Sequence, residues 1–208
     1  MPVRKILLPS ALQSGVLQSP RVSTTQLGTA YELLALELLS AHPYYMELIR
    51  VGGANDKGID LRGRWETSLT NLSSSERKNR SRSGSGLFDV IVQCKAERSP
   101  LRPSVLREFE GVLQNQALSD FTSSRRPSTP TVGILVSLSG FTKSTIDRSV
   151  ESRWPISLVH YKIEREKLKL KENGKVDPLQ RSLDNAEEDV VSWNKNQAWR
   201  ELVGDTDD

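Results

Sequence analysis

Residues 87–95 read Leu-Phe-Asp-Val-Ile-Val-Gln-Cys-Lys, and apolar and polar residues alternate clearly along them. Successive side chains of a strand leave opposite faces, so the stretch divides into two sets. One face carries Phe88, Val90, Val92 and Cys94, and the other carries Asp89, Ile91, Gln93 and Lys95. The alternation predicts a strand with an apolar core face and a non-core face on which Gln93 and Lys95 are neighbours.

A hairpin is predicted just before this strand. Residues 45–51 and 59–65 are typical of two strands, and the glycine-rich stretch 52–58 between them supplies the residues that turns require. Asp60 is the second residue of the returning strand. If that strand neighbours residues 87–95, Asp60 lies beside Gln93 and Lys95.

Helical and apolar segments surround these three strands. Apolar residues three and four apart predict a helix over 27–41, which Thr24 or Thr25 can cap. The remaining expected elements are a helix opened by Pro103, a buried central strand at 131–138, a helix at 142–153, a strand at 156–163 and a last helix at 184–203. This order predicts an α/β layer fold with a mixed sheet.

Composition excludes several classes of protein. No apolar run in the 208 residues approaches the ~20 needed to span a bilayer, so we expect no membrane insertion. The single cysteine, Cys94, and two histidines exclude a disulfide scaffold and a Cys/His zinc site. A bound metal would therefore have oxygen ligands, as Mg²⁺, Mn²⁺ and Ca²⁺ prefer. The net charge of +3 alone says little about a polyanionic partner.

The N-terminal segment is basic and rich in Ser and Thr, and no acidic residue precedes Glu32. This composition is typical of a mitochondrial transit segment, although a plain N-terminal segment without a fold can share it. We expect a mitochondrial protein. The expected organisation is a transit segment at 1–23, a core at 24–163, a charged linker at 164–183 and a helix with an acidic tail at 184–208.

A polar insertion at 68–86 interrupts the expected core. It is rich in Ser, Asn, Arg and Gly and cannot bury enough apolar surface to order itself. It is either a basic loop that contacts phosphates or a solvated insertion without a function. The candidate nucleic-acid contacts are Lys57, Arg77, Lys78, Arg80, Arg82 and Lys143.

Asp60, Gln93 and Lys95 form a set that suits phosphodiester hydrolysis. Carboxylate and amide oxygens are ligands for Mg²⁺ or Mn²⁺, and a nearby backbone carbonyl can join them. Such a metal polarises phosphoryl oxygens, and a lysine can offset negative charge in the transition state. Two plainer interpretations remain: Asp60 bonds turn amides, or it pairs with Lys95 in a surface salt bridge.

Three blocks of the chain resemble the Mrr-like restriction endonucleases, a branch of the PD-(D/E)xK nuclease superfamily. They are Gly-Thr-Ala-Tyr-Glu at 28–32, Gly-Gly-Ala-Asn-Asp-Lys-Gly-Ile-Asp-Leu at 52–61 and Val-Gln-Cys-Lys at 92–95. Residues 105–111 and Phe-Thr-Lys at 141–143 resemble further segments of the branch. Within it, the chain is most similar to the fungal mitochondrial family of required for respiratory growth protein 7.

The resemblance implies a restriction-endonuclease-like three-layer fold with a central mixed β-sheet flanked by helices. It also implies that Asp60 binds a metal, that Lys95 is catalytic and that Glu32 assists the metal site. Gln93 and the backbone carbonyl of Cys94 would be further ligands. Gln93 stands where the superfamily usually has an acid, so this site has one negative charge fewer than is usual.

The hypothesis that follows is an endonuclease-like, Mg²⁺- or Mn²⁺-dependent phosphodiesterase acting in mitochondria on nucleic acid, with DNA favoured over RNA. The alternative is a weak or inactive nuclease-fold protein that binds nucleic acid or a partner in mitochondrial genome maintenance or expression. The oligomeric state stays open, with a homodimer as one option.

Overall fold

A computed structural model describes residues 23–41, 44–53, 57–67, 86–122, 129–163 and 190–203. The predicted transit segment, the charged linker and nearly all of the basic insertion, with Arg77, Lys78, Arg80 and Arg82, lie outside the described residues. No helix within the described ranges is long and apolar enough to cross a membrane.

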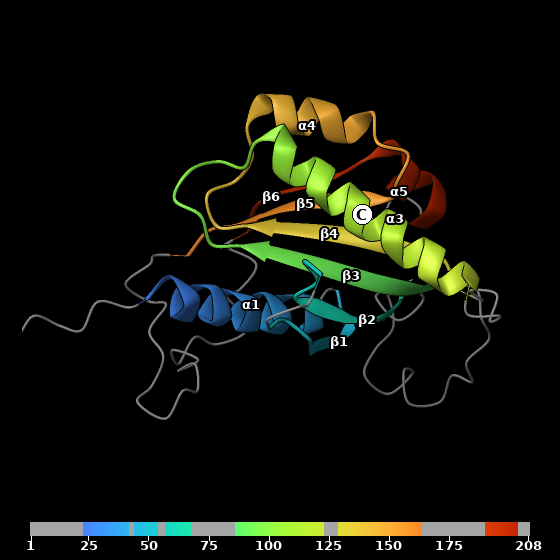
Figure 1. Cartoon of the computed structure of the whole chain (residues 1–208), viewed down its shortest axis with the longest axis horizontal. Coiled ribbons are helices and arrows are strands. Elements are labelled where there is room, and N and C mark those ends of the chain that lie inside the picture. The colour runs from blue at the N-terminus through green and yellow to red at the C-terminus, as the bar shows by residue number, and fades with distance from the viewer. Residues whose placement is uncertain are drawn as a thin grey trace, which may run out of the picture.

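A six-stranded mixed sheet forms the middle layer, in the order β1-β2-β3-β4-β5-β6 (Figure 1). The strands are β1 (Glu47–Arg50), β2 (Leu61–Glu66), β3 (Leu87–Lys95), β4 (Thr131–Ser137), β5 (Ile156–Tyr161) and β6 (Val190–Lys195). β2 pairs antiparallel with β1 and β3, β4 pairs parallel with β3 and β5, and β6 is antiparallel to β5. The predicted hairpin and mixed sheet are confirmed.

Helices cover both faces of the sheet, which completes the predicted three layers. The helices are α1 (Thr24–Ser40), α3 (Pro103–Thr122), α4 (Lys143–Val150) and α5 (Gln197–Val203). α1 and α3 lie on opposite sides of the sheet, and α4 lies on the side of α3 (Figure 1). Each face buries its own apolar cluster, with Tyr31 and Trp199 in one and Phe109 and Leu135 in the other.

The division of β3 into two faces is confirmed, but the expectation of a non-core face is wrong. Val90 and Val92 pack in the cluster on the α1 side. Ile91, which shares its face with Gln93 and Lys95, packs with Phe109 of α3. Because α3 covers the middle of that face, Gln93 is buried, while Asp89 near the start of the strand and Lys95 at its end are partly exposed.

Two local predictions about helices need correction. α1 is capped by Ser23 rather than by Thr24 or Thr25, because the Ser23 hydroxyl and the Gln26 side chain form a reciprocal capping box. The helix predicted over 184–203 is wrong over 190–195, which form β6, and residues 184–189 lie outside the described residues. Asn196 then starts α5, because its Oδ1 accepts a hydrogen bond from the Trp199 backbone N–H at 2.9 Å.

Candidate functional site

Asp60 lies where β2 begins, directly beside the end of β3. Its backbone N–H donates to the Val92 carbonyl at 2.9 Å, and its Oδ2 accepts from the Cys94 N–H at 2.7 Å. The Cys94 N–H thus donates to a side-chain carboxylate where, in a continued β2–β3 pairing, it would donate to a backbone carbonyl. This position puts the carboxylate against the residue that separates Gln93 from Lys95.

The backbone carbonyl of Cys94 points to the same edge of β3 as its N–H, as in any extended strand. Since the N–H points at Asp60, the carbonyl oxygen is directed toward the space next to that carboxylate. The role of the Cys94 carbonyl as an oxygen ligand stays a prediction.

Glu32 reaches the same place from α1. A Cβ built on Gly52 would lie 3.0 Å from Glu32 Oε2 and 3.3 Å from Asp60 Oδ1. The separation of these two carboxylate oxygens therefore cannot exceed the sum of the two distances. Gly52 leaves room for both because it has no side chain. Two like charges this close raise each other's energy unless a cation lies near them.

Arg50 supplies one such cation, and no sequence pattern identifies it as a site residue. Its Nε lies 2.6 Å from Glu32 Oε2, with the Glu32 side chain largely buried. The pair joins the last residue of β1 to α1 across 18 positions of sequence, so no periodic pattern announces it. Its only sequence signal is its position two residues before Gly52.

Gln93 points toward α3, and its amide oxygen lacks a partner. The residue is only 6% exposed, and Nε2 would meet a Cβ on Gly58 at 3.1 Å. Oε1 is buried and accepts no hydrogen bond from any group in the described ranges. An unsatisfied buried carbonyl costs about 1–3 kcal/mol, and a bound cation would remove that cost.

Lys95 is half-buried at the end of β3, and it forms no ion pair with the residues that the structure describes. Its charge acts on the neighbouring thiol. Burial raises the pKa of Cys94 well above its ordinary value, the Asp60 and Glu32 carboxylates raise it further, and Lys95 opposes them. Cys94 therefore stays a neutral thiol, surrounded by two acids and one lysine.

The site has two carboxylates, not three. Within the described part of the chain, no three His, Cys, Asp or Glu side chains are grouped to hold a metal ion. A metal here would need neutral oxygens besides Asp60 and Glu32, and Gln93 Oε1 and the Cys94 carbonyl are of the kind that Mg²⁺ and Mn²⁺ accept.

The two described candidates for nucleic-acid contact are both exposed lysines. Lys57 is exposed in the turn after β1, with a positive φ of 56°. Lys143, at the start of α4, pairs with Asp147 one helical turn later at 2.9 Å. Their exposure permits phosphate contact, but nothing in their geometry singles them out for it.

The fold and this group of residues together define the class. The structure is a three-layer α/β protein with a central mixed sheet, and Asp60 directly before β2 lies beside the Gln-x-Lys that ends β3. The family model of required for respiratory growth protein 7 matches residues 23–200, and the chain belongs to that family.

Relatives agree with this assignment. The chain is 31% identical over 152 residues to a mitochondrial protein of Schizosaccharomyces pombe, covering 73% of this chain and 51% of the relative, so it spans about half of that protein's length. It is 28% identical to the mitochondrial required for respiratory growth protein 7 of Saccharomyces cerevisiae, covering 84% of this chain and 79% of the relative. These names confirm the predicted mitochondrial localisation.

One solved structure is similar at a greater distance. It is described as the MspJI restriction endonuclease in complex with a 27-mer oligonucleotide. The match has 20% sequence identity and a TM-score of 0.37, and it covers 75% of this chain and 34% of that one.

Proposed function

We propose that the protein is a metal-dependent nuclease that hydrolyses phosphodiester bonds in mitochondrial nucleic acid, with DNA as the favoured substrate. The observation that carries the proposal is the 2.7 Å hydrogen bond from the Cys94 N–H to Asp60 Oδ2. It fixes a carboxylate against the backbone of the residue that separates Gln93 from Lys95 on β3.

The residues fit a divalent cation of the Mg²⁺ or Mn²⁺ type. Asp60 and Glu32 supply anionic oxygens, and Gln93 supplies a buried carbonyl oxygen that has no other partner in the described chain. When bound, such an ion polarises a phosphoryl oxygen and lowers the pKa of its water. The Lys95 ammonium would stabilise negative charge that develops on the phosphate.

Cleavage assays test this proposal. The full chain is incubated with plasmid, single-stranded circular and flapped DNA, and with RNA, in Mg²⁺, Mn²⁺ or EDTA. We expect metal-dependent cleavage that falls roughly 100-fold or more in Asp60→Asn and in Lys95→Ala. Asp60→Asn is chosen because an amide oxygen can still accept from the Cys94 N–H.

Two matched controls accompany these variants. Asp147→Asn makes the same acid-to-amide change on exposed α4, and Lys162→Ala removes an exposed lysine after β5. Both should cut at the wild-type rate. A wild-type protein that cuts none of the substrates, or site variants that cut as well as the controls, would overturn the proposal.

The second candidate is a nuclease-fold protein that binds nucleic acid without cutting it. The observation that favours it is the 2.6 Å ion pair with Arg50, which occupies the Glu32 carboxylate and leaves Asp60 as the main anionic ligand. Binding that weakens steeply with salt, is unchanged in Asp60→Asn and occurs without cleavage would support this candidate.

A further inference from the structure

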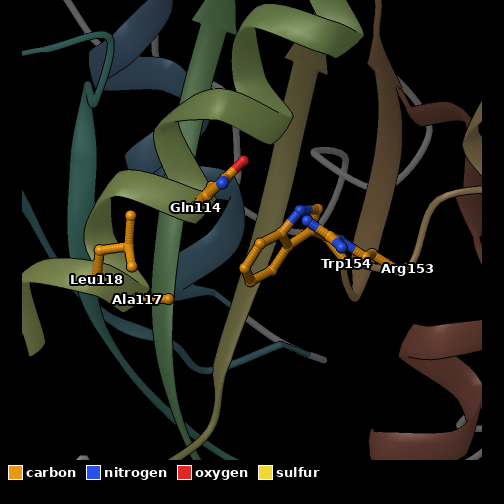
Figure 2. A pocket seen from close by; sticks show the side chains of 5 residues that line it. All are labelled: Gln114, Ala117, Leu118, Arg153 and Trp154. Atoms are coloured by element: carbon orange, nitrogen blue, oxygen red, sulfur yellow. The ribbon is translucent and has the colours of Figure 1, made fainter. Parts of the chain in front are cut away.

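A hollow of about 330 Å³ lies on the face of the sheet that α3 covers, away from Asp60. Gln114, Ala117 and Leu118 of α3 form one side, and Trp154 with Arg153 forms the other (Figure 2). The lining is mostly apolar, and the hollow is open to solvent. Leu118 is 56% exposed, which is unusual for a large apolar side chain and leaves part of the wall uncovered.

Two features of the hollow suit a flat, polarisable ligand. The indole of Trp154 offers an aromatic face, and the Arg153 guanidinium carbon lies 5.7 Å from the centre of that ring. Bases stack on aromatic rings and on guanidinium planes in this way, whatever their sequence. The Gln114 amide, on the opposite wall, can donate to or accept from the edge of such a ligand.

The charge at this place also points to an anionic ligand. Arg153 forms no ion pair within the part of the chain that the structure describes. The nearby acid Glu151 faces Arg148 instead, at 4.0 Å. A guanidinium without a carboxylate partner, next to an open apolar hollow, complements a phosphate joined to a base.

Trp154 is held rigidly by backbone contacts. Its carbonyl accepts from Asn196 Nδ2 at 2.7 Å, and Asn196 is almost fully buried. Asn196 also bonds Ser149 and Ser152, so the segment between α4 and β5 is fixed from several points. A preorganised aromatic face loses little entropy when a ligand stacks on it.

We propose that this hollow binds one unpaired nucleobase of a nucleic-acid strand, with the base stacked on Trp154 and the adjoining phosphate next to Arg153. The inference rests on the proposed function in one respect, that the ligand is nucleic acid. It adds a preference for substrates with a single-stranded segment.

Binding without divalent metal tests the inference separately from cleavage. The full chain is titrated, in EDTA, against a fluorescein-labelled single-stranded oligothymidylate and against a fully paired duplex of the same length, with anisotropy as the readout. Trp154→Leu should weaken single-strand binding roughly tenfold and change duplex binding little. Trp154→Phe, which keeps an aromatic face, should restore most of the affinity.

A second variant blocks the hollow without touching the tryptophan. Ala117→Phe should fill it and weaken single-strand binding to a similar extent, so the test does not depend on Trp154→Leu folding. Arg153→Gln should weaken binding to the single strand and reduce its salt dependence. Arg107→Gln, an exposed change of the same charge elsewhere on α3, should have little effect on the difference between the two DNAs.

The outcomes separate the two proposals. Folded variants that bind the single strand as the wild type does, while the wild type still cuts DNA, would overturn this inference and leave the proposed function standing. A wild type that binds no nucleic acid in EDTA overturns this inference, and an apolar side chain of a protein partner then becomes the better occupant. The proposed function is overturned as well only if this wild type also cuts none of the substrates with Mg²⁺ or Mn²⁺. Thymidine monophosphate binding as tightly as the oligonucleotide would show a free-nucleotide site and overturn the assignment to a strand.

Discussion

The Asp60 carboxylate and the Cys94 backbone are joined by a hydrogen bond of 2.7 Å between Oδ2 and N. Through this bond, a side chain extends the ladder between β2 and β3 by one step before the first residue of β2. The same carboxylate presents its other oxygen, Oδ1, toward Gly52 and Glu32. Asp60 is thus both a structural acceptor and an anionic group of the candidate site, and a variant must keep the first role to test the second.

Gly52→Ala should disturb the site while sparing the fold. The new methyl group would lie 3.0 Å from Glu32 Oε2 and 3.3 Å from Asp60 Oδ1, so one carboxylate has to move. We expect metal-dependent cleavage to fall at least tenfold, because misplacement by about 1 Å is costly in catalysis. Gly53→Ala is the control, since nothing lies within 4 Å of its added methyl. Equal rates in the two variants would contradict the placement of the two acids.

Arg50→Gln should strengthen binding of a divalent cation. Arg50 and Lys95 balance the two carboxylates, and removing one cation leaves the group with a net charge of about −1. We expect Mn²⁺ affinity, measured by calorimetry, to rise roughly fivefold. Arg64→Gln, an exposed change on β2 near Asp89, should leave it unchanged. Weaker Mn²⁺ binding in Arg50→Gln would instead mean that Arg50 acts by positioning Glu32.

Tyr31→Phe should lower the free energy of unfolding at neutral pH. It should also make that free energy fall less steeply as the pH rises above 10. The Tyr31 hydroxyl donates to the Tyr161 carbonyl at 2.9 Å, and burial, with smaller contributions from Cys94 and Tyr161, raises its pKa far above the ordinary 10.0. A raised pKa stabilises the folded state below the ordinary value, and this stabilisation is lost as pH rises above it.

Urea unfolding from pH 7 to 11 measures both effects. At pH 7 the free energy of unfolding of Tyr31→Phe should be about 1 kcal/mol lower than that of the wild type. Above pH 10 the free energies of unfolding of the two proteins should converge, because only the wild type loses the contribution of Tyr31. Both proteins should lose stability from about pH 9, because both keep Cys94 with its raised pKa. Parallel curves over the whole range would contradict the buried, protonated state of Tyr31.

Asn196→Ala should be among the most destabilising single changes. Oδ1 accepts from the backbone N–H groups of Ile156 and Trp199, and Nδ2 donates to three carbonyls between α4 and β5. Removing the side chain leaves several buried groups unpaired, at a cost of about 3 kcal/mol or more in chemical denaturation.

Asn196→Asp distinguishes the donors from the acceptors of this residue. The aspartate keeps an oxygen for the Ile156 and Trp199 N–H groups but turns the other oxygen toward carbonyls. It should therefore fail to restore stability at pH 7. Wild-type stability in Asn196→Asp would contradict the assigned orientation of the amide.

Much of the fold follows from local sequence patterns. Alternation over 87–95 predicted β3 with its correct bounds and its two sets of side chains, and the glycine-rich turn predicted the β1–β2 hairpin. The prediction of a helix over residues 190–195 was wrong because β6 depends on pairing with β5, which is distant in sequence. Val190 and Trp193 fit either pattern locally, and Asn196, the cap that separates strand from helix, was not recognised as a boundary.

The site was predictable only in part. The adjacency of Asp60 to residues 93–95 follows from the antiparallel pairing of β2 with β3. The ion pair of Arg50 with Glu32 and the burial of Gln93 under α3 depend on tertiary packing, which no spacing in the sequence encodes. The ion pair decides how much of the Glu32 charge is available to a cation, and the burial of Gln93 leaves its amide oxygen without solvent.

The central claim is that Asp60 and Gln93 hold one divalent cation together, and electron paramagnetic resonance of added Mn²⁺ tests it most directly. We predict a bound Mn²⁺ signal in the wild-type chain, its loss in Asp60→Asn and tighter binding in Gln93→Glu, where a carboxylate replaces an amide whose oxygen has no hydrogen-bond partner among the described residues. Folded protein that binds no Mn²⁺, or identical binding in all three chains, would contradict the claim.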